Sequence, residues 1–160
     1  MAASIPTAES VADAAPPAGG VGGLTPDGKE VDFPKLPKGA SEISKDAPKT
    51  FTKTESGLRY RVLRKGTGKF PKASNSVEVN YHGWTNSGKV FDSSYERGES
   101  ISFPLNGVIP GWTEGMQLVA EGGMIELEIP SKLGYGERGA GKDIPPGATL
   151  HFLVELLQVK

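Results

Sequence analysis

The chain contains no cysteine and only two histidines, His82 and His151. The absence of cysteine excludes disulfide bonds, thiolate nucleophiles and cysteine-ligated zinc, and it is compatible with a reducing or an oxidising compartment. Each histidine lies opposite the apolar residues of its predicted strand, so we expect both to face solvent. A metal site and a Ser-His-Asp triad, which would need an inward-facing imidazole, are therefore not expected.

The chain also lacks an excess of charge of either sign and a long apolar run. Its formal net charge is −1, whereas binding nucleic acid through phosphate contacts requires a basic excess or a basic stripe. No apolar run approaches the roughly 20 residues of a membrane-spanning helix, and residues 1–23 do not resemble a signal peptide. We predict no nucleic-acid partner and no membrane span. The chain as given favours a cytoplasmic protein, and the alternative is a periplasmic or exported protein after removal of a leader.

The composition changes near residue 49. Residues 1–48 are rich in Ala, Pro, Gly and Ser, and Phe33 is their only aromatic residue. They cannot bury enough apolar surface to offset the entropy of ordering. We therefore expect a disordered arm over residues 1–48 and one folded domain over residues 49–160, although residues 31–37 could instead form an extended docking segment.

From Phe51 onward, apolar and polar residues alternate with the period of a β-strand. This alternation predicts strands over residues 58–62, 77–81, 125–129 and 150–159, each with one side facing solvent, as in antiparallel sheets. Only residues 111–118 have the spacing of a helix. The sequence therefore predicts an α+β domain in which a twisted antiparallel β-sheet packs on one short α-helix.

Aromatic residues gather in three short stretches, residues 90–94, 108–112 and 134–136. Trp112 opens the predicted helix beside a Pro-Gly pair, and Tyr135 lies in a glycine-rich loop. The two rings could form the floor and the wall of an apolar cleft. The alternative is that these aromatic residues simply pack in the core, as they usually do in small β-rich domains.

One carboxylate, Asp92, lies beside these aromatic residues and needs a partner there. Arg97 is the natural candidate, because a guanidinium can hold a desolvated carboxylate with two hydrogen bonds. The sequence leaves open whether this pair is structural, contacts a ligand, or does both. Ser93 and Ser94 are interpreted as turn and cap hydroxyls, since no base is expected beside them.

Residues 57–160 resemble the FKBP-type peptidyl-prolyl cis-trans isomerases, in a bacterial, single-domain version. The matching stretches follow in family order over residues 79–83, 90–94, 103–105, 108–112, 129–130, 133–136 and 144–150. The resemblance implies a sheet wrapped around a short helix, with a hydrophobic groove that binds Xaa-Pro peptide bonds. The long dimerising helix of some bacterial members has no counterpart here, which favours a monomer.

The resemblance also implies the residues of the site. The catalytic positions would be Tyr81, Phe91, Asp92, Ile109, Tyr135 and Phe152, and the substrate-binding positions Arg97, Ile101, Phe103, Val108, Trp112 and Ile144. Trp112 would lie under the proline ring, while the Ile109 N–H and the Tyr135 hydroxyl would bind carbonyl oxygens. No metal and no cofactor are implied.

The implied activity is acceleration of Xaa-Pro rotation in proline-containing polypeptides, which assists protein folding. The implied inhibitors are macrolides of the rapamycin type. Ile101, Ala140 and Asp143 depart from residues common in the family and line the rim, so they bear on macrolide affinity and sequence preference. The alternative function is a chaperone module that binds proline-containing segments with little turnover.

Overall fold

The computed structural model describes residues 25–160. The strands are β1 (Thr25–Glu30), β2 (Thr50–Lys53), β3 (Arg59–Arg64), β4 (Ser76–Thr85), β5 (Val90–Ser93), β6 (Ile101–Pro104), β7 (Met124–Ile129) and β8 (Leu150–Val159). The helices are α1 (Ser94–Arg97) and α2 (Pro110–Gly115), and the short 3₁₀ turns are η1 (Leu105–Gly107), η2 (Met116–Leu118) and η3 (Ser131–Leu133). Within this part of the chain no helix is long and apolar enough to cross a membrane.

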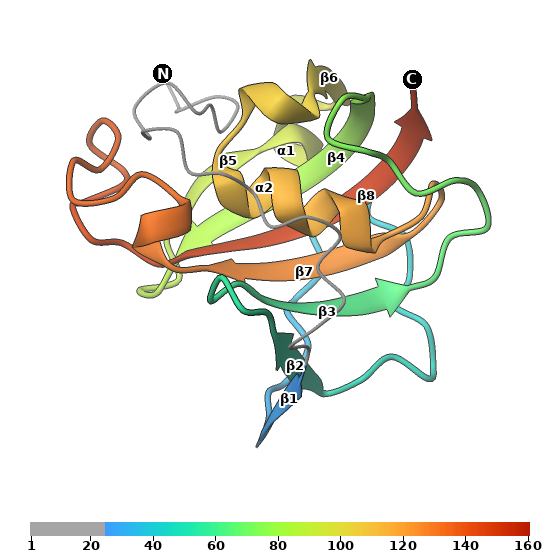
Figure 1. Cartoon of the computed structure of the whole chain (residues 1–160), viewed down its shortest axis with the longest axis horizontal. Helices are drawn as coiled ribbons and strands as arrows, with labels where there is room; N and C mark the ends of the chain where they lie inside the picture. Colours follow the sequence, from blue (N-terminus) through green and yellow to red (C-terminus); the bar gives the residue numbers. More distant parts are fainter. Residues whose placement is uncertain (1–24) are drawn as a thin grey trace.

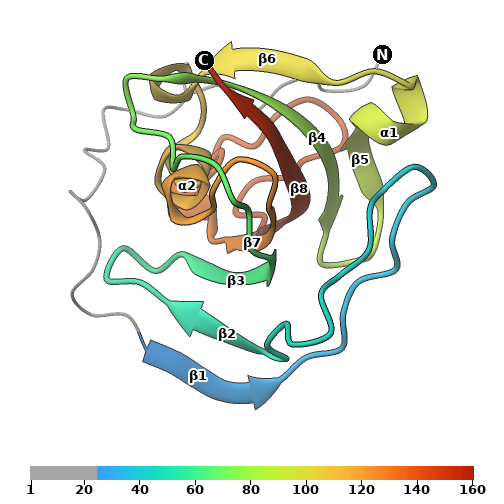
Figure 2. The ribbon, with the colours of Figure 1, turned by 90° about the vertical axis from the view of Figure 1, so that its right-hand side faces the viewer.

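The eight strands form one antiparallel sheet with the order β1-β2-β3-β7-β8-β4-β5, and β6 pairs with β4 off this path. The sheet curves around α2, which lies against its inner face (Figures 1 and 2). The predicted α+β fold, a twisted antiparallel sheet with a short helix, is confirmed. The one-turn helix α1 was not predicted, because four residues are too few to show a helical period.

Helix α2 is short and completely buried. Pro110 stands in its first turn, where the missing N–H costs no hydrogen bond. Two glycines allow the helix to approach β7 closely, since a Cβ at Gly111 would lie 2.6 Å from Ile129 and one at Gly115 would lie 2.6 Å from Leu127. The chain then tightens into the 3₁₀ turn η2, so the helical region predicted over residues 111–118 is divided into two turn types.

The inner face of the sheet carries the main apolar core. Along β4, the fully buried Val77, Val79 and Tyr81 alternate with half-buried polar residues. This is the expected arrangement for a strand with one side on the core. The same cluster includes α2 and the inner residues of β7 and β8, so a single core joins the helix to the sheet.

The outer face of the sheet is covered where β3, β7 and β8 adjoin, and this differs from the sequence prediction. Glu126 and Glu155, expected on a solvent-facing side, are each only 4% exposed. Residues 31–49 run along this face from β1 toward β5 and α1 (Figure 2). Phe33 and Leu36 from this segment pack on a second apolar cluster that includes Leu63, Met124 and Leu153. The prediction of one wet side per strand was wrong here because a remote segment covers it.

Arg61 fastens the covering segment to the sheet. Its side chain donates to Glu126 Oε1 at 2.7 Å, to the carbonyl oxygens of Val31 and Lys49 at 2.7 and 2.9 Å, and to that of Asp32 at 2.9 Å. The guanidinium is also 4.9 Å from the Phe33 ring centroid. Four of its five N–H donors are therefore used, although Arg61 is only 1% exposed.

Glu155 forms a second polar anchor on the same face. It accepts hydrogen bonds from the Tyr95 hydroxyl at 2.6 Å, from the Ser41 N–H at 3.2 Å and from Arg64 Nη2 at 3.1 Å. Burial alone would raise the pKa of Glu155, but these hydrogen bonds outweigh it and the pKa is lowered.

These contacts bear on the predicted domain limits. Residues 1–24 of the predicted arm lie outside the described residues. Residues 25–48 contain β1 and the segment on the outer face. The disordered arm and the boundary at residue 48 stay predictions.

Candidate functional site

Three aromatic rings pack against Trp112 on the inner face of the sheet, and a fourth packs on one of them. The ring centroids of Tyr81, Phe103 and Phe152 lie 5.4, 5.2 and 5.2 Å from that of Trp112, and Phe91 lies 5.4 Å from Phe152. Most of these pairs meet edge to face, the arrangement that aromatic quadrupoles favour. The rings come from β4, β5, β6, α2 and β8, so the fold as a whole fixes their positions.

Glycine in β4 makes room for two of these rings. A Cβ at Gly83 would lie 2.7 Å from Phe91 Cζ and 2.8 Å from Phe152 Cε1, closer than packed carbon atoms approach. The position two residues after Tyr81 faces the same side of the sheet. Gly83 therefore allows Phe91 and Phe152 to pack beside Tyr81.

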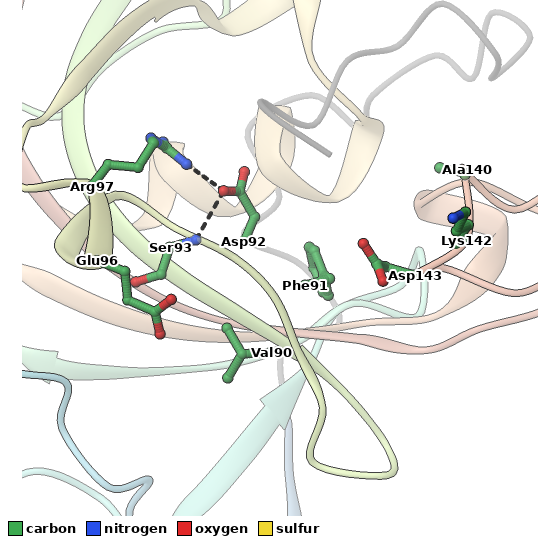
Figure 3. A pocket seen from close by; sticks show the side chains of 10 residues that line it. Val90, Phe91, Asp92, Ser93, Glu96, Arg97, Ala140, Lys142 and Asp143 are labelled. Carbon is green, nitrogen blue, oxygen red and sulfur yellow. Dashed lines mark hydrogen bonds and ion pairs between the residues drawn. The ribbon is translucent and has the colours of Figure 1, made fainter. Parts of the chain in front are cut away.

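Asp92 is buried and held on both sides. Its Oδ1 accepts from Arg97 Nη1 and, at 2.9 Å, from the Ser93 N–H, while its Oδ2 accepts from the Tyr81 hydroxyl. The expected Asp92–Arg97 ion pair is thus present (Figure 3). Burial and the hydrogen bond to Asp92 raise the pKa of Tyr81 above its usual value, so its hydroxyl stays protonated. Asp92 and Arg97 thereby orient Tyr81.

The two serines have different partners. Ser94 Oγ accepts from the Tyr81 N–H at 2.8 Å and donates to Asn80 Oδ1 at 2.8 Å, so it braces β4. Ser93 Oγ lies 2.8 Å from His82 Nδ1. The expectation that no base lies beside Ser93 was wrong, because register pairs the two residues across β4 and β5. The Asp92 carboxylate hydrogen-bonds Arg97, Tyr81 and the Ser93 N–H rather than His82, so these residues do not assemble a triad.

Both histidines are half-buried rather than fully facing solvent as expected. Burial lowers the pKa of His82 and of His151, despite nearby acidic groups that act in the opposite direction. Among residues 25–160 no group of three or more histidine and acidic side chains is placed to hold a metal ion.

An open cavity of about 740 Å³ lies in front of Asp92. One side is formed by β5 and α1, including Phe91, Asp92 and Arg97, and the other by residues 140–143. Figure 3 shows Asp143 on the side of the loop that faces Phe91. An ion pair of 3.1 Å between Lys89 and Asp143 joins the two sides. The cavity therefore has apolar and charged walls.

The loop on the far side of this cavity is compact. The Ala140 N–H donates to the Ile144 carbonyl oxygen at 2.8 Å, and Ile144 returns a longer bond of 3.2 Å. A Cβ at Gly139 would lie 2.4 Å from that carbonyl oxygen, and its φ of +70° also favours glycine. Ala140 and Asp143 line the cavity, as expected for rim positions.

The predicted site residues divide into three groups. Phe91, Asp92 and Arg97 line the cavity directly. Behind them, in the same apolar cluster, lie Tyr81, Phe103, Val108, Ile109, Trp112, Tyr135, Ile144 and Phe152. Ile101 is partly buried against that cluster. All of them thus belong to one region, although most form its buried backing.

Sequence reasoning missed Val90, Glu96 and Lys142 as cavity-lining residues. Val90 is the first residue of the matching stretch 90–94, and that membership was the available signal. Glu96 lies in α1, which was not predicted, and Lys142 has the same appearance in the sequence as any exposed lysine. The charges of Glu96 and Lys142 become relevant only because the loop of residues 140–143 faces β5.

The indole N–H of Trp112 is buried among these rings. In the part of the chain that the structure describes, its buried indole Nε1 has no hydrogen-bond partner. Buried donors are normally satisfied, so such a group calls for an explanation.

Comparison with known proteins gives a consistent result. Residues 67–157 match the family described as FKBP-type peptidyl-prolyl cis-trans isomerase. The FKBP-type 22 kDa peptidyl-prolyl cis-trans isomerase of Escherichia coli (strain K12) is 54% identical over 106 residues, which cover 66% of this chain and 52% of that protein. FkpA of Aeromonas hydrophila is 52% identical over 124 residues, covering 77% of this chain and 46% of that one. The chain therefore spans about half the length of these curated relatives.

Solved structures agree with this. The crystal structure of FkpA from Escherichia coli has a TM-score of 0.66 at 50% identity, covering 73% of this chain and 53% of that one. AtFKBP13 has a TM-score of 0.64 at 34% identity, covering 69% of this chain and 98% of that one.

Proposed function

The chain belongs to the FKBP-type peptidyl-prolyl cis-trans isomerases, and we propose that it accelerates rotation about Xaa-Pro bonds in proline-containing polypeptides. The observation that carries the proposal is the aromatic cluster centred on Trp112, which backs a cavity bordered by Phe91 and the Asp92–Arg97 pair. An apolar surface with a few fixed polar groups suits a proline ring and its two flanking amides. Assistance to protein folding follows from the same activity.

The reaction needs no reactive side chain. Rotation about a peptide bond has a barrier of about 18–20 kcal/mol, and Xaa-Pro bonds interconvert over tens to hundreds of seconds. The planar amide is stabilised by charge-separated resonance, which water favours, and the twisted amide has lost much of that dipole. Because no group is transferred, the proposed mechanism involves neither a metal nor a cofactor.

An apolar pocket therefore favours the twisted form relative to the planar one, provided that it also fits the twisted geometry better. An acceleration of about 10⁴-fold requires only about 5.5 kcal/mol. Desolvation, shape and two hydrogen bonds are sufficient for this amount.

Each group of residues has a proposed role. Trp112 supports the proline ring, with Phe91, Phe103, Val108 and Phe152 as the apolar surround. The Ile109 N–H and the Tyr135 hydroxyl bind the carbonyl oxygens of the substrate. The Asp92–Arg97 pair positions the Tyr81 hydroxyl, which gives the carboxylate a function in addition to its ion pair. Ile101 and Ile144 border the neighbouring subsites.

We extend the proposal to inhibitors of the rapamycin type and to a monomeric protein. The departures at Ala140 and Asp143 lie on the cavity wall, and Asp143 forms an ion pair there with Lys89. A macrolide would have to displace or accommodate this pair, so we expect weaker binding than with an apolar residue at position 143.

The test is a protease-free isomerisation assay on Xaa-Pro tetrapeptides, with and without rapamycin. We expect catalysis above the buffer rate, and losses of about 10- to 100-fold in kcat/KM for Tyr135→Phe and Asp92→Leu, or about 1.4–2.7 kcal/mol. Phe70→Ala is a matched control, because Phe70 is 60% exposed and lies outside the cavity. A buffer rate from protein with native circular dichroism would refute the enzyme and leave the proline-binding chaperone as the alternative.

A further inference from the structure

A second cavity, of about 980 Å³, lies on the outer face of the sheet. One wall is residues 34–38 of the covering segment, and the other is formed by β4, the β4–β5 turn and α1. We call this cavity the outer groove. The proposed isomerase mechanism gives it no role.

The floor of the outer groove is aromatic. His82 and Trp84, two residues apart on β4, point to the same side of the strand, and their ring centroids are 5.8 Å apart. Trp84 also stacks on His151 of β8, with centroids 5.7 Å apart and planes at 8°. Burial lowers the pKa of both histidines, so the floor is uncharged at neutral pH. Such a floor suits apolar or proline side chains.

The opposite wall carries Pro34, Leu36 and Pro37. This wall is fixed before anything binds, because Leu36 packs on the apolar cluster of the outer face. Arg61 also holds the backbone just before it, through the carbonyl oxygens of Val31 and Asp32. A preformed groove binds an extended chain with less loss of entropy than a wall that must first become ordered.

The charges at the rim are mixed. Lys35 and Lys38 belong to the segment wall, and Glu96 belongs to α1 on the other side. A ligand whose charges all have the same sign, such as nucleic acid, would be attracted by one wall and repelled by the other. An extended polypeptide presents both donors and acceptors along its length and fits such a rim better.

The outer groove adjoins the proposed isomerase cavity. Val90 and Glu96 line both cavities, and Val90 is 38% exposed. The strand between the cavities is β5, which stands at the end of the sheet order and pairs only with β4 among the described strands. A chain leaving the first cavity can therefore cross β5 at Val90 and enter the second.

We infer that the outer groove is an extended subsite for the same client chain, binding an apolar stretch of it while an Xaa-Pro bond occupies the first cavity. This inference rests on the proposed isomerase function. Binding at two connected sites raises the effective concentration of the Xaa-Pro bond at the first. Long unfolded chains would then be better substrates than short peptides.

The test compares an Xaa-Pro tetrapeptide with peptides of about 16 residues, which span roughly 50 Å when extended. One long peptide continues before the proline and another after it, each with apolar residues in the extension. We expect kcat/KM for one of the two long peptides to exceed that for the tetrapeptide by about tenfold. Trp84→Ala should abolish this gain and leave the tetrapeptide value within about twofold, and Trp84→Phe should restore part of the gain.

Amide chemical-shift mapping of the unaltered protein tests the same point without a substitution. The long peptide should shift the amides of Lys35, Leu36, Lys38, His82 and Trp84, whereas the tetrapeptide should not. Phe70→Ala is the matched surface control and should keep the full length dependence.

The outcomes separate the two proposals. Tetrapeptide turnover at the buffer rate would refute the isomerase and this inference with it. Normal tetrapeptide turnover with no gain from length, or with a gain that survives Trp84→Ala, would refute the outer groove alone. A dimer seen by sedimentation that Trp84→Ala dissociates would also overturn the inference, because a second copy of the chain would then occupy the groove.

Discussion

The two faces of the sheet are built from different kinds of interaction. On the inner face, Trp112 and its neighbouring rings pack edge to face, and the space left by Gly83 is filled by ring atoms. On the outer face, Arg61 and Glu155 hydrogen-bond to a distant segment and form ion pairs with Glu126 and Arg64 of the sheet. The inner face is specified by shape and the outer face by polar pairing.

This difference has an energetic consequence. Apolar packing stabilises in proportion to the area buried. A buried ion pair contributes little net stability, but it is costly to break because an uncompensated charge remains. A single substitution on the outer face should therefore reduce stability more than one on the inner face. A single substitution on the inner face should reduce activity more.

The largest expected effect is that of Arg61→Met. The substitution leaves the buried Glu126 without its partner and removes the donor to three carbonyl oxygens. We expect the free energy of unfolding to fall by about 3–5 kcal/mol. Urea denaturation measures this loss, and tetrapeptide isomerisation by the remaining folded protein should be unchanged.

The control for this prediction is the double substitution Arg61→Met with Glu126→Leu. Removing both charges should recover much of the loss, since apolar pairs of similar volume can replace buried ion pairs. Burial raises the pKa of Glu126 more than Arg61 lowers it, which agrees with a desolvated carboxylate. Unaltered stability in the single variant would show that the polar pairing is not what holds the outer face.

A smaller effect is expected from Gly83→Ala on the inner face. The added Cβ would press on Phe91 and Phe152, and overpacking of this kind costs about 1–3 kcal/mol. Because both rings border the proposed pocket, kcat/KM per folded molecule should fall as well. Phe70→Ala is the control, because Phe70 is 60% exposed and lines neither cavity. Equal activity of Gly83→Ala and the parent protein would show that the position of these rings does not control catalysis.

The smallest effect is the pH dependence of stability contributed by His82 and His151. Their pKa values in the folded protein are lowered from 6.5, chiefly by burial, so the unfolded chain binds protons more readily. The free energy of unfolding is then highest above pH 6.5 and falls as the pH drops through 6.5 toward the folded-state pKa values. Glu96 near His82, and Glu128 near His151, reduce these shifts, while Arg59 adds to that of His151.

Urea titrations at about pH 7.5 and pH 5.5 measure how far the free energy of unfolding falls between these two pH values. The double variant His82→Gln with His151→Gln should show a smaller fall. The pKa of Glu126 is raised in the folded protein, so its contribution to the free energy of unfolding falls as the pH rises, opposite to that of the histidines. This contribution changes at pH values nearer 4.5, the ordinary pKa of a glutamate. An identical slope in the double variant would assign the dependence to other groups.

The inner face could be predicted from the sequence because its signals are local. Alternation along residues 77–81 and 125–129 located two central strands, and the Pro-Gly pair before Trp112 located the helix. The outer face could not be predicted in this way. Arg61, Glu126 and Glu155 have the same alternation as solvent-facing residues, and nothing local shows that residues 31–49 cover them.

The candidate site could likewise be predicted only where its residues are close in sequence. The Asp92–Arg97 pair was found because both residues are close in sequence and a buried carboxylate needs a cation. The cavity itself depends on how residues 140–143 face β5, a contact between segments about 50 residues apart. The outer groove was missed entirely, because its two walls are joined only by the fold.

Strand β8 has a consequence for biosynthesis. It lies between β7 and β4, pairing Val159 with Val77 and Leu150 with Ile129, yet it is the last strand of the domain to leave the ribosome. Until residues 150–159 have emerged, the edges of β7 and β4 that pair with β8 have no partner strand. Because these pairings link distant parts of the chain, closure of the domain should be slow and follow translation. The nascent chain is itself unfolded and contains prolines, so under the proposed function we expect finished copies of the same protein to act on it.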